Sequence, residues 1–376
     1  MKHYTPILIV LFLLSHLSLM ALDISVKNPI NRERQNETVE IDWNIVVQKL
    51  HLKTGDKVIV VDSKGVEYPS QLVFEERKSP QKLIFQLSFS AKQTRVVMIR
   101  KGLPQNYESK TFGRFVPERK DDYAWENDRV AFRMYGPALI KTDGPCNGID
   151  IWCKRTEKPI INLRYEKELS GKGSYHTDWG DGLDIYKVGR TLGAGAMAPY
   201  LNDSLFLGSN FEQQETLDNG PIRTTFKLTY HPFDVCGSSV SESRTISLDA
   251  GSQFCKIVEE YIGLPKNISV AAGIVKRPNS DSTVIDPLKK YFIYFEPKSP
   301  KDGSLALAIV SAKRWERIKC IKNHTIAITN YNSNQKTIYY TGFGWSKWGF
   351  STAISWIKHT DNFSKNLEDR LIIKIK

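Results

Sequence analysis

The segment 175–195 is rich in groups that can carry out chemistry. Its 21 positions hold one His, three Asp, two Tyr and five Gly. Histidine and carboxylates transfer protons, and glycines let the backbone approach a ligand closely. Asp178, Asp181 and Asp184 recur every third residue, and the glycines between them favour a loop over a helix. The alternative is a solvated surface turn, because Asp and Gly are common turn residues.

Within this segment His176 is the candidate general base. It follows Tyr175 and precedes three carboxylates, and a nearby carboxylate can hold the imidazole tautomer and raise the histidine pKa. The three carboxylates are also oxygen ligands of the kind that Ca²⁺ binds, but no EF-hand pattern is present, so we expect no metal and no other cofactor. The catalytic candidates are Tyr175, His176, Glu126, Asp178 and Asp181.

A second cluster lies at residues 123–137, where Trp125 and polar residues precede a predicted strand. Because strand side chains alternate between two faces, Arg129, Arg133 and Tyr135 are predicted to share one face. Arginine recognises carboxylates through paired hydrogen bonds, so this face suits a carboxylate-bearing sugar. The alternative is an ordinary solvent-facing side of a strand whose apolar residues lie in the core.

Two further stretches offer aromatic platforms for sugar rings. Alternation over residues 148–155 places Trp152 on the same side as two polar residues, and Trp345 lies among aromatic and glycine residues at 339–348. The alternatives are that Trp152 covers a sheet and that Trp345 fills the core. The candidates for substrate contact are Trp125, Asn127, Arg129, Arg133, Tyr135, Trp152, Asp184, Tyr186 and Trp345.

The start of the chain has the features of a secretory signal peptide. A short basic stretch precedes an apolar run at residues 7–14, and the small residue Ala21 follows. The run is short and is interrupted at His16, so we predict cleavage of residues 1–21 rather than a membrane anchor. No later segment reaches the ~18 apolar residues of a membrane span. We therefore predict an extracytoplasmic protein, periplasmic or secreted.

The formal net charge of the chain is +12. A basic balance favours acidic partners, which are nucleic acid, anionic membranes or acidic polysaccharides. Predicted export argues against nucleic acid, and the dispersed charge argues against a membrane-binding patch. An acidic glycan is the expected partner, and a charge that serves only solubility is the alternative. The five cysteines lack metal-ligand spacing. Export permits one or two disulfides, but the spacing of the cysteines does not determine which of them pair.

Strand signals dominate the first part of the chain. Stretches rich in β-branched and aromatic residues recur at 58–62, 82–89 and 94–100, with turn residues between them. This spacing predicts a small antiparallel β-sandwich domain over residues 22–110. The irregular segment 101–122 is the predicted linker.

Later strand signals predict a second, larger antiparallel β-sandwich over residues 111–376, which is the expected catalytic domain. Helical spacing occurs only at 351–371, which predicts a short C-terminal helix. The predicted fold class is therefore all-β.

Three stretches, 123–139, 148–155 and 175–189, together resemble a secreted bacterial family known as domain of unknown function 4861. The resemblance extends from about residue 25 to the end of the chain. It implies a β-sandwich related to galactose-mutarotase-like supersandwiches. It also implies a role in polysaccharide utilisation, beside enzymes that act on uronic-acid polymers. The resemblance assigns no mechanism to individual residues.

The resulting hypothesis is a carbohydrate-active enzyme for acidic glycans, either a lyase or a hydrolase. A β-eliminating lyase needs a group that neutralises the uronate carboxylate, a base and an acid. Arg133 or Asn127 would neutralise the carboxylate, His176 would be the base, and Tyr175 or Tyr186 would be the acid.

A hydrolase would instead pair Glu126 with Asp181 or Asp178. A non-catalytic glycan-binding protein and a sugar mutarotase or epimerase are the alternatives. In each enzymatic case we expect residues 126–133 and 175–186 to converge on one cleft.

Overall fold

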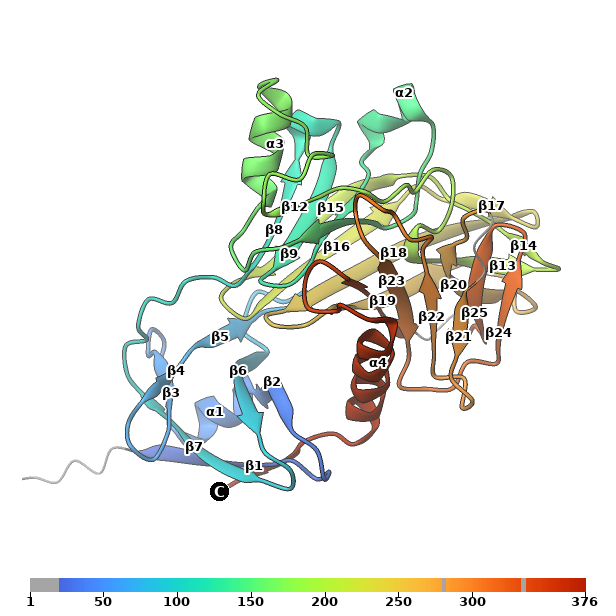
Figure 1. Ribbon diagram of the computed structural model, residues 1–376. Coiled ribbons are helices and arrows are strands. Elements are labelled where there is room, and N and C mark those ends of the chain that lie inside the picture. The colour runs from blue at the N-terminus through green and yellow to red at the C-terminus, as the bar shows by residue number, and fades with distance from the viewer. Residues whose placement is uncertain (1–19, 279–281, 333–335) are drawn as a thin grey trace, which may run out of the picture.

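The computed structural model describes residues 20–278, 282–332 and 336–376 (Figure 1). The predicted signal peptide, residues 1–21, lies almost entirely outside the described residues. Within the described residues the strands form five sheets, and neighbouring strands pair in antiparallel fashion. The predicted all-β, antiparallel fold class is confirmed.

The first strands form a small N-terminal sandwich of two sheets. One sheet has the order β27 (Ile372–Ile375), β1 (Ala21–Lys27), β7 (Thr94–Lys101), β3 (Val58–Val61) and β4 (Glu67–Tyr68). The other has the order β2 (Arg34–Asp42), β6 (Lys82–Phe89) and β5 (Ser70–Val73), and α1 (Trp43–Lys49) follows β2. Alternate apolar side chains, such as Ile24 and Phe85, fill the space between the sheets.

One strand of this sandwich comes from the far end of the chain. β27 pairs with β1, with Ile24 opposite Ile375. The N-terminal sandwich thus combines residues 21–101 with 372–375, whereas the sequence prediction assigned everything after residue 110 to the larger sandwich. Strand pairing over this separation leaves no local signal in the sequence.

The larger sandwich also consists of two sheets. The nine-stranded sheet has the order β15 (Phe211–Asn219), β16 (Arg223–Tyr230), β18 (Ser238–Asp249), β19 (Phe254–Ile262), β26 (Thr337–Trp345), β23 (Leu305–Val310), β22 (Tyr291–Phe295) and β21 (Thr283–Ile285), and β17 (Phe233–Val235) pairs with β18. The second sheet has the order β14 (Ser204–Leu205), β13 (Ala194–Leu201), β20 (Ser269–Val275), β25 (His324–Asn330) and β24 (Arg317–Ile321). Buried side chains of both sheets, among them Ile257 and Ala272, form one core.

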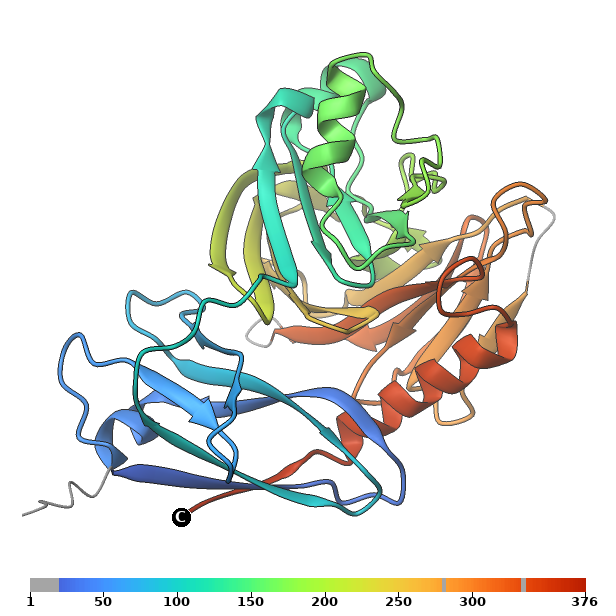
Figure 2. The same cartoon turned by 60° about the vertical axis from the view of Figure 1, so that its left-hand side comes forward.

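A further five-stranded sheet lies against the larger sandwich and carries the stretches that sequence analysis singled out. Its order is β12 (Gly182–Leu183), β11 (Asp150–Lys154), β10 (Ala131–Met134), β9 (Asp122–Asn127) and β8 (Thr111–Val116). One face packs into the larger core through Trp125 and Phe132, which contact Phe226 and Phe343. The helix α3 (Ile161–Leu169) covers the other face (Figure 2). Short helices η1 (Pro117–Arg119), η2 (Pro137–Leu139) and α2 (Ile140–Asp143) occupy two of the connections.

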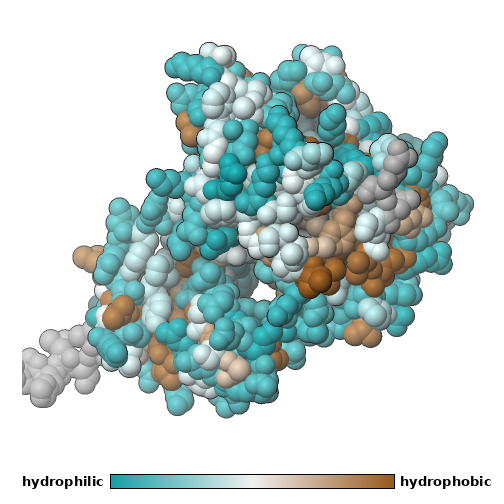
Figure 3. All heavy atoms as spheres, viewed as in Figure 1, coloured by the Kyte–Doolittle hydropathy of each residue, from teal (hydrophilic) through white to brown (hydrophobic). Residues whose placement is uncertain are grey.

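The C-terminal helix α4 (Ala353–Glu368) joins the two sandwiches, and its prediction from residues 351–371 is confirmed. The Thr352 hydroxyl caps its first turn by accepting from the Ser355 N–H. Its buried face packs Trp356 and Phe363 on Phe254 of the nine-stranded sheet. Beside α4 the surface is hollowed between the N-terminal and larger sandwiches (Figure 3).

Two further observations concern the whole chain. All five cysteines are free in the structure. None of the described helices has both the length and the apolar character needed to cross a membrane.

Candidate active site

The predicted polar face of the sheet β8–β12 is covered by another part of the chain and does not face solvent. As alternation predicts, Phe132 and Ile151 point into the larger core, while Arg133, Asp150 and Trp152 point the other way. The segment from α3 to β12 lies over that second face, and Trp152 stacks on the Tyr175 ring at 5.2 Å. The predicted open glycan-binding face is therefore wrong, because these side chains form a buried polar cluster.

Arg133 is the centre of this cluster. Its Nη2 donates to Asp150 Oδ2 at 2.5 Å and to Asp184 Oδ2 at 2.8 Å. Its guanidinium carbon lies 5.0 Å from the ring centres of Tyr135 and Trp152, so aromatic faces enclose the charge. The side chain is 3% exposed, which means that Arg133 holds internal carboxylates and does not meet a sugar directly.

More carboxylates than cations lie around Arg133. Asp122 is fully buried 3.8 Å from Arg133 Nη1, and Tyr135 donates its hydroxyl proton to Asp150 at 2.7 Å. Burial and the nearby Asp150 raise the pKa of Asp184 to about 7, although Arg133 opposes the shift. Burial likewise raises the pKa of Asp122 to about 6. Two carboxyls of the cluster therefore have pKa values above the ordinary aspartate value.

His176 connects this buried cluster to the surface. Its side chain is 62% exposed, and its Nδ1 lies 2.9 Å from the backbone oxygen of Asp184. A carbonyl oxygen only accepts hydrogen bonds, so Nδ1 carries the proton of the neutral ring and Nε2 keeps its lone pair. Nε2 has no hydrogen-bond partner in the described part of the chain. This is the tautomer that a general base requires.

Tyr175 contacts both His176 and Arg119. The Tyr175 ring meets the imidazole edge to face at 4.7 Å, and the Tyr175 hydroxyl accepts from Arg119 Nη2 at 3.0 Å. Arg119 also pairs with Asp122 at 3.3 Å, and its side chain is 19% exposed. Sequence analysis missed Arg119 because it lies in the irregular segment taken for a linker. Only its position just before the cluster at residues 123–137 could have drawn attention to it.

The other predicted carboxylates are engaged in structural ion pairs. Asp178 pairs with Arg155 at 2.9 Å, and Asp181 pairs with Arg164. With Asp184 on Arg133, the three acidic residues of the 175–195 segment thus face three different arginines. No cluster of three or more metal-ligating side chains exists among the described residues.

Glu126 has a structural role that the sequence analysis did not anticipate. It is buried, accepts from Lys154 Nζ at 2.6 Å, and accepts from the backbone N–H groups of Ile160 and Ile161 at 2.9 Å. Those N–H groups begin α3, where a helix has unpaired donors and a positive dipole end. The catalytic prediction for Glu126 is therefore wrong, because both carboxylate oxygens are occupied in a dry site.

Three residues that were predicted to contact substrate, Trp125, Trp345 and Asn127, are buried inside the protein. Trp125 is in the larger core and donates to Cys255 Sγ at 3.1 Å, and Trp345 donates to the Asp302 oxygen at 2.7 Å. Asn127 donates to the Asp249 oxygen at 2.6 Å and is buried. These three predictions are wrong, because no sugar ring can reach a side chain that the core encloses.

Three other residues that were predicted to contact substrate differ in their exposure to solvent. Tyr186 is buried beneath Arg277, and burial raises its pKa far above the ordinary tyrosine value, so it is not an accessible acid. Arg129 lies at the surface and pairs with Glu157 at 3.1 Å, outside the face of Arg133. Tyr135 is partly buried against Arg133. Residues 126–133 and 175–186 meet through the Arg133–Asp184 pair, but this contact is buried and is not the cleft that was predicted.

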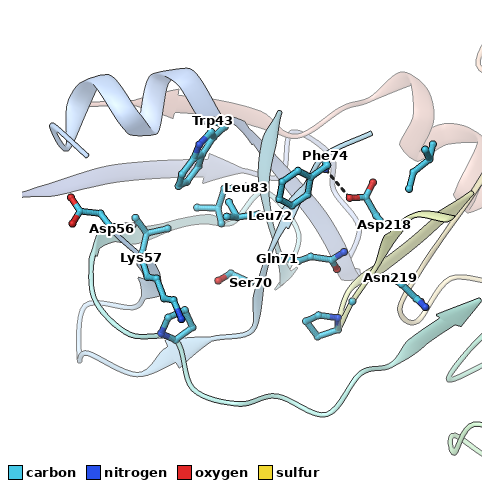
Figure 4. Close-up of a pocket in the computed structure, with 15 residues that line it drawn as sticks. Trp43, Asp56, Lys57, Ser70, Gln71, Leu72, Phe74, Leu83, Asp218 and Asn219 are labelled. Atoms are coloured by element: carbon cyan, nitrogen blue, oxygen red, sulfur yellow. Dashed lines mark hydrogen bonds between the residues drawn. The ribbon is translucent and has the colours of Figure 1, made fainter. Parts of the chain in front are cut away.

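A separate pocket of about 560 Å³ opens between the N-terminal sandwich and the loop at 217–221 (Figure 4). Trp43, Leu72 and Leu83 form its apolar wall, and Asp218 accepts from the Phe74 N–H at 2.7 Å at its far end. None of the predicted site residues lines it. The pocket is therefore distinct from the Arg133–His176 site.

Comparison with solved structures identifies the fold. The chain matches a protein in the glycosyl hydrolase family 38 from Enterococcus faecalis with a TM-score of 0.55 and 9% sequence identity. It matches an alpha-mannosidase from Enterococcus faecalis V583 equally well. Each match covers 95% of this chain but only 47% and 46% of those longer chains. The chain thus has a fold found in about half the length of these proteins.

Comparison of sequences gives a relative with higher sequence identity. "Uncharacterized protein P7" of Formosa agariphila is 32% identical, over 94% of this chain and 93% of the relative. The family model described as Domain of unknown function (DUF4861) matches residues 26–373. This chain therefore belongs to the domain of unknown function 4861 family.

Proposed function

We propose that this chain is an extracytoplasmic enzyme that acts on uronate-containing glycans by β-elimination, with His176 as the base. The observation that carries the proposal is the free Nε2 of His176, on an exposed ring whose tautomer is fixed by the Asp184 carbonyl. Such an imidazole can accept a proton from a substrate at the surface without any rearrangement of the protein. The fold shared with glycosyl hydrolase family 38 proteins agrees with a carbohydrate substrate, and the net charge of +12 favours an acidic one.

The proposed reaction balances with His176 and solvent water. His176 Nε2 takes the C5 proton of the uronate, and the released electron pair forms the C4–C5 double bond as the C4–oxygen bond breaks. Water gives a proton to the leaving oxygen, because Tyr175, like Tyr186, is buried. Arg119 donates to the Tyr175 hydroxyl and helps to hold the Tyr175 ring against the His176 imidazole.

Arg119 also supplies the positive charge that this reaction needs. Removal of a C5 proton places negative charge on the uronate carboxylate, which a cation must stabilise. Arg119 is partly exposed and contacts Tyr175, whose ring touches His176, whereas Arg133 is enclosed by its carboxylates. We therefore assign carboxylate neutralisation to Arg119.

Hydrolysis by a carboxylate pair has less support. Glu126 is buried against Lys154, and Asp178 and Asp181 are held by arginines, so none is free to act as acid or nucleophile. A mutarotase or epimerase would also use His176 as a base. A glycan-binding protein would use none of this proton chemistry.

The proposal predicts unsaturated products. Incubated with uronate polymers such as polygalacturonate, alginate or glucuronan, the mature protein should raise the ultraviolet absorbance that a conjugated C4–C5 double bond produces. Matched neutral polymers should give no signal, because they lack the carboxylate that Arg119 binds. Saturated reducing sugars formed without an absorbance change would instead support hydrolysis, and binding without any product would support a glycan-binding protein.

A further inference from the structure

A second polar cavity lies away from the His176 site, in the hollow beside α4 (Figure 3). Its volume is about 490 Å³, and it lies between β2, the outer face of the nine-stranded sheet and α4. None of the residues at the Arg133–His176 site lines it. Its chemistry is therefore independent of the proposed catalytic centre.

Three hydrogen-bond donors form a row along the floor of this cavity. Ser247 of β18 is directly opposite Lys256 of β19, and Lys256 is directly opposite Tyr340 of β26. Opposed residues on neighbouring strands have their Cβ atoms about 5 Å apart on one face of a sheet. All three residues line the cavity, so a hydroxyl, an ammonium and a phenol lie side by side.

These three donors have no acceptor in the described part of the chain. Neither a hydrogen bond nor an ion pair occupies Ser247 Oγ, Lys256 Nζ or Tyr340 Oη. The neighbouring charges are paired: Arg223 binds Glu40 at 2.7 Å and Asp249 at 2.5 Å. Lys256 is thus the lysine or arginine of the cavity lining that makes neither a hydrogen bond nor an ion pair in the described part of the chain.

The surroundings of Lys256 are partly buried and carry charges of both signs. Burial lowers the Lys256 pKa and the nearby Arg223 lowers it further, while Glu40 and Asp249 act in the opposite direction. Above the row, the Phe363 ring meets Tyr340 edge to face at 5.2 Å, and α4 closes that side. An apolar wall beside a row of donors suits a ligand with one anionic group and one less polar face.

We infer that the row Ser247–Lys256–Tyr340 binds the carboxylate or sulfate group of an acidic saccharide, as a second site apart from His176. The anionic group follows from the three free donors, while the saccharide class rests on the proposed function. Such a site would hold a polymeric substrate without taking part in its cleavage. One charge-assisted hydrogen bond of this kind is worth about tenfold in affinity or more.

Competitive acylation of lysines, read by mass spectrometry, tests this inference without any need for turnover. The probes are tetragalacturonate, sodium sulfate and neutral cellotetraose. We expect tetragalacturonate or sulfate to slow acylation of Lys256 about tenfold or more at saturation. Protection by tetragalacturonate alone identifies a carboxylate site, and protection by sulfate identifies an anion site that also accepts sulfate. Lys256 acylation that neither anion changes, or that cellotetraose slows equally, would overturn the inference.

Variants separate this site from the proposed catalytic centre. In calorimetry with tetragalacturonate, Lys256→Met should remove one binding event. Lys227→Met is the matched control, because Lys227 lies on the same sheet and pairs with Glu76 at 2.9 Å outside the cavity. The His176→Ala protein should retain full protection of Lys256. Protection that persists where no elimination is found would reject the proposed catalysis and leave the anion site in place.

Discussion

His176→Ala should lower the rate of elimination by ~10²–10⁴-fold, which is the usual contribution of a general base. Its thermal midpoint should change by no more than a few degrees, because the side chain is largely exposed and makes one hydrogen bond. Initial rates on a uronate polymer and thermal unfolding of the same samples give both quantities. Loss of catalysis with retained stability distinguishes a catalytic histidine from a structural one.

The matched control for this variant is His231→Ala. His231 is 69% exposed and lies 3.1 Å from Glu212, so it resembles His176 in exposure and in having an acidic neighbour. It belongs to neither proposed site, and its variant should keep the wild-type rate. Equal losses in the two variants, or a His176→Ala protein that loses rate and stability together, would contradict the assignment of His176 as the base.

Arg133→Met should destabilise the folded protein by about 3–5 kcal/mol, the cost of removing one partner from a buried ion pair. The substitution leaves Asp150 and Asp184 facing each other without a cation in a site closed to water. Urea denaturation of the two proteins at one pH measures the difference. Arg129→Met is the control, since Arg129 forms only a partly exposed pair with Glu157 and should cost less than about 1 kcal/mol.

The loss of folding stability caused by Arg133→Met should grow as the pH rises. The pKa of Asp184 in the folded protein is about 7, above its ordinary value of 3.8, so folding favours the protonated carboxyl. The stability that this preference contributes is present below pH 3.8 and is lost as the pH rises through 7. Without Arg133 the ionised carboxylates repel each other fully, so the variant should be weakest above pH 7. A destabilisation independent of pH, or no larger than that of Arg129→Met, would contradict this role.

Within β10 and β11 the sequence was sufficient to predict which residues share a strand face, whereas Arg129 lies before β10 and outside that face. Phe132 and Ile151 alternate with Arg133 and Asp150, and a period of two places each pair on opposite sides in any sheet. The two chemistry-rich stretches also meet through the Arg133–Asp184 pair, although this buried contact is not the predicted cleft. These successes depend on local periodicity and on a concentration of charged residues, both of which are visible in one sequence.

The cover over that face could not be predicted, because it depends on contacts between distant residues. The helix α3 has a mostly polar sequence, and its first N–H groups are capped by Glu126, 34 and 35 residues earlier in the chain. A carboxylate that caps a helix has the same residue type as one that donates a proton to substrate. Composition therefore placed Glu126 among the catalytic residues, and only the fold assigns it to a structural role.

The central claim is that His176 removes the C5 proton of a uronate. Proton NMR of an oligouronate incubated with the mature protein in D₂O tests this most directly. The account predicts loss of the C5 proton signal together with the new vinyl signal of the C4–C5 double bond, and neither change with His176→Ala. A C5 proton signal that persists while the protein binds or hydrolyses the oligosaccharide would contradict it.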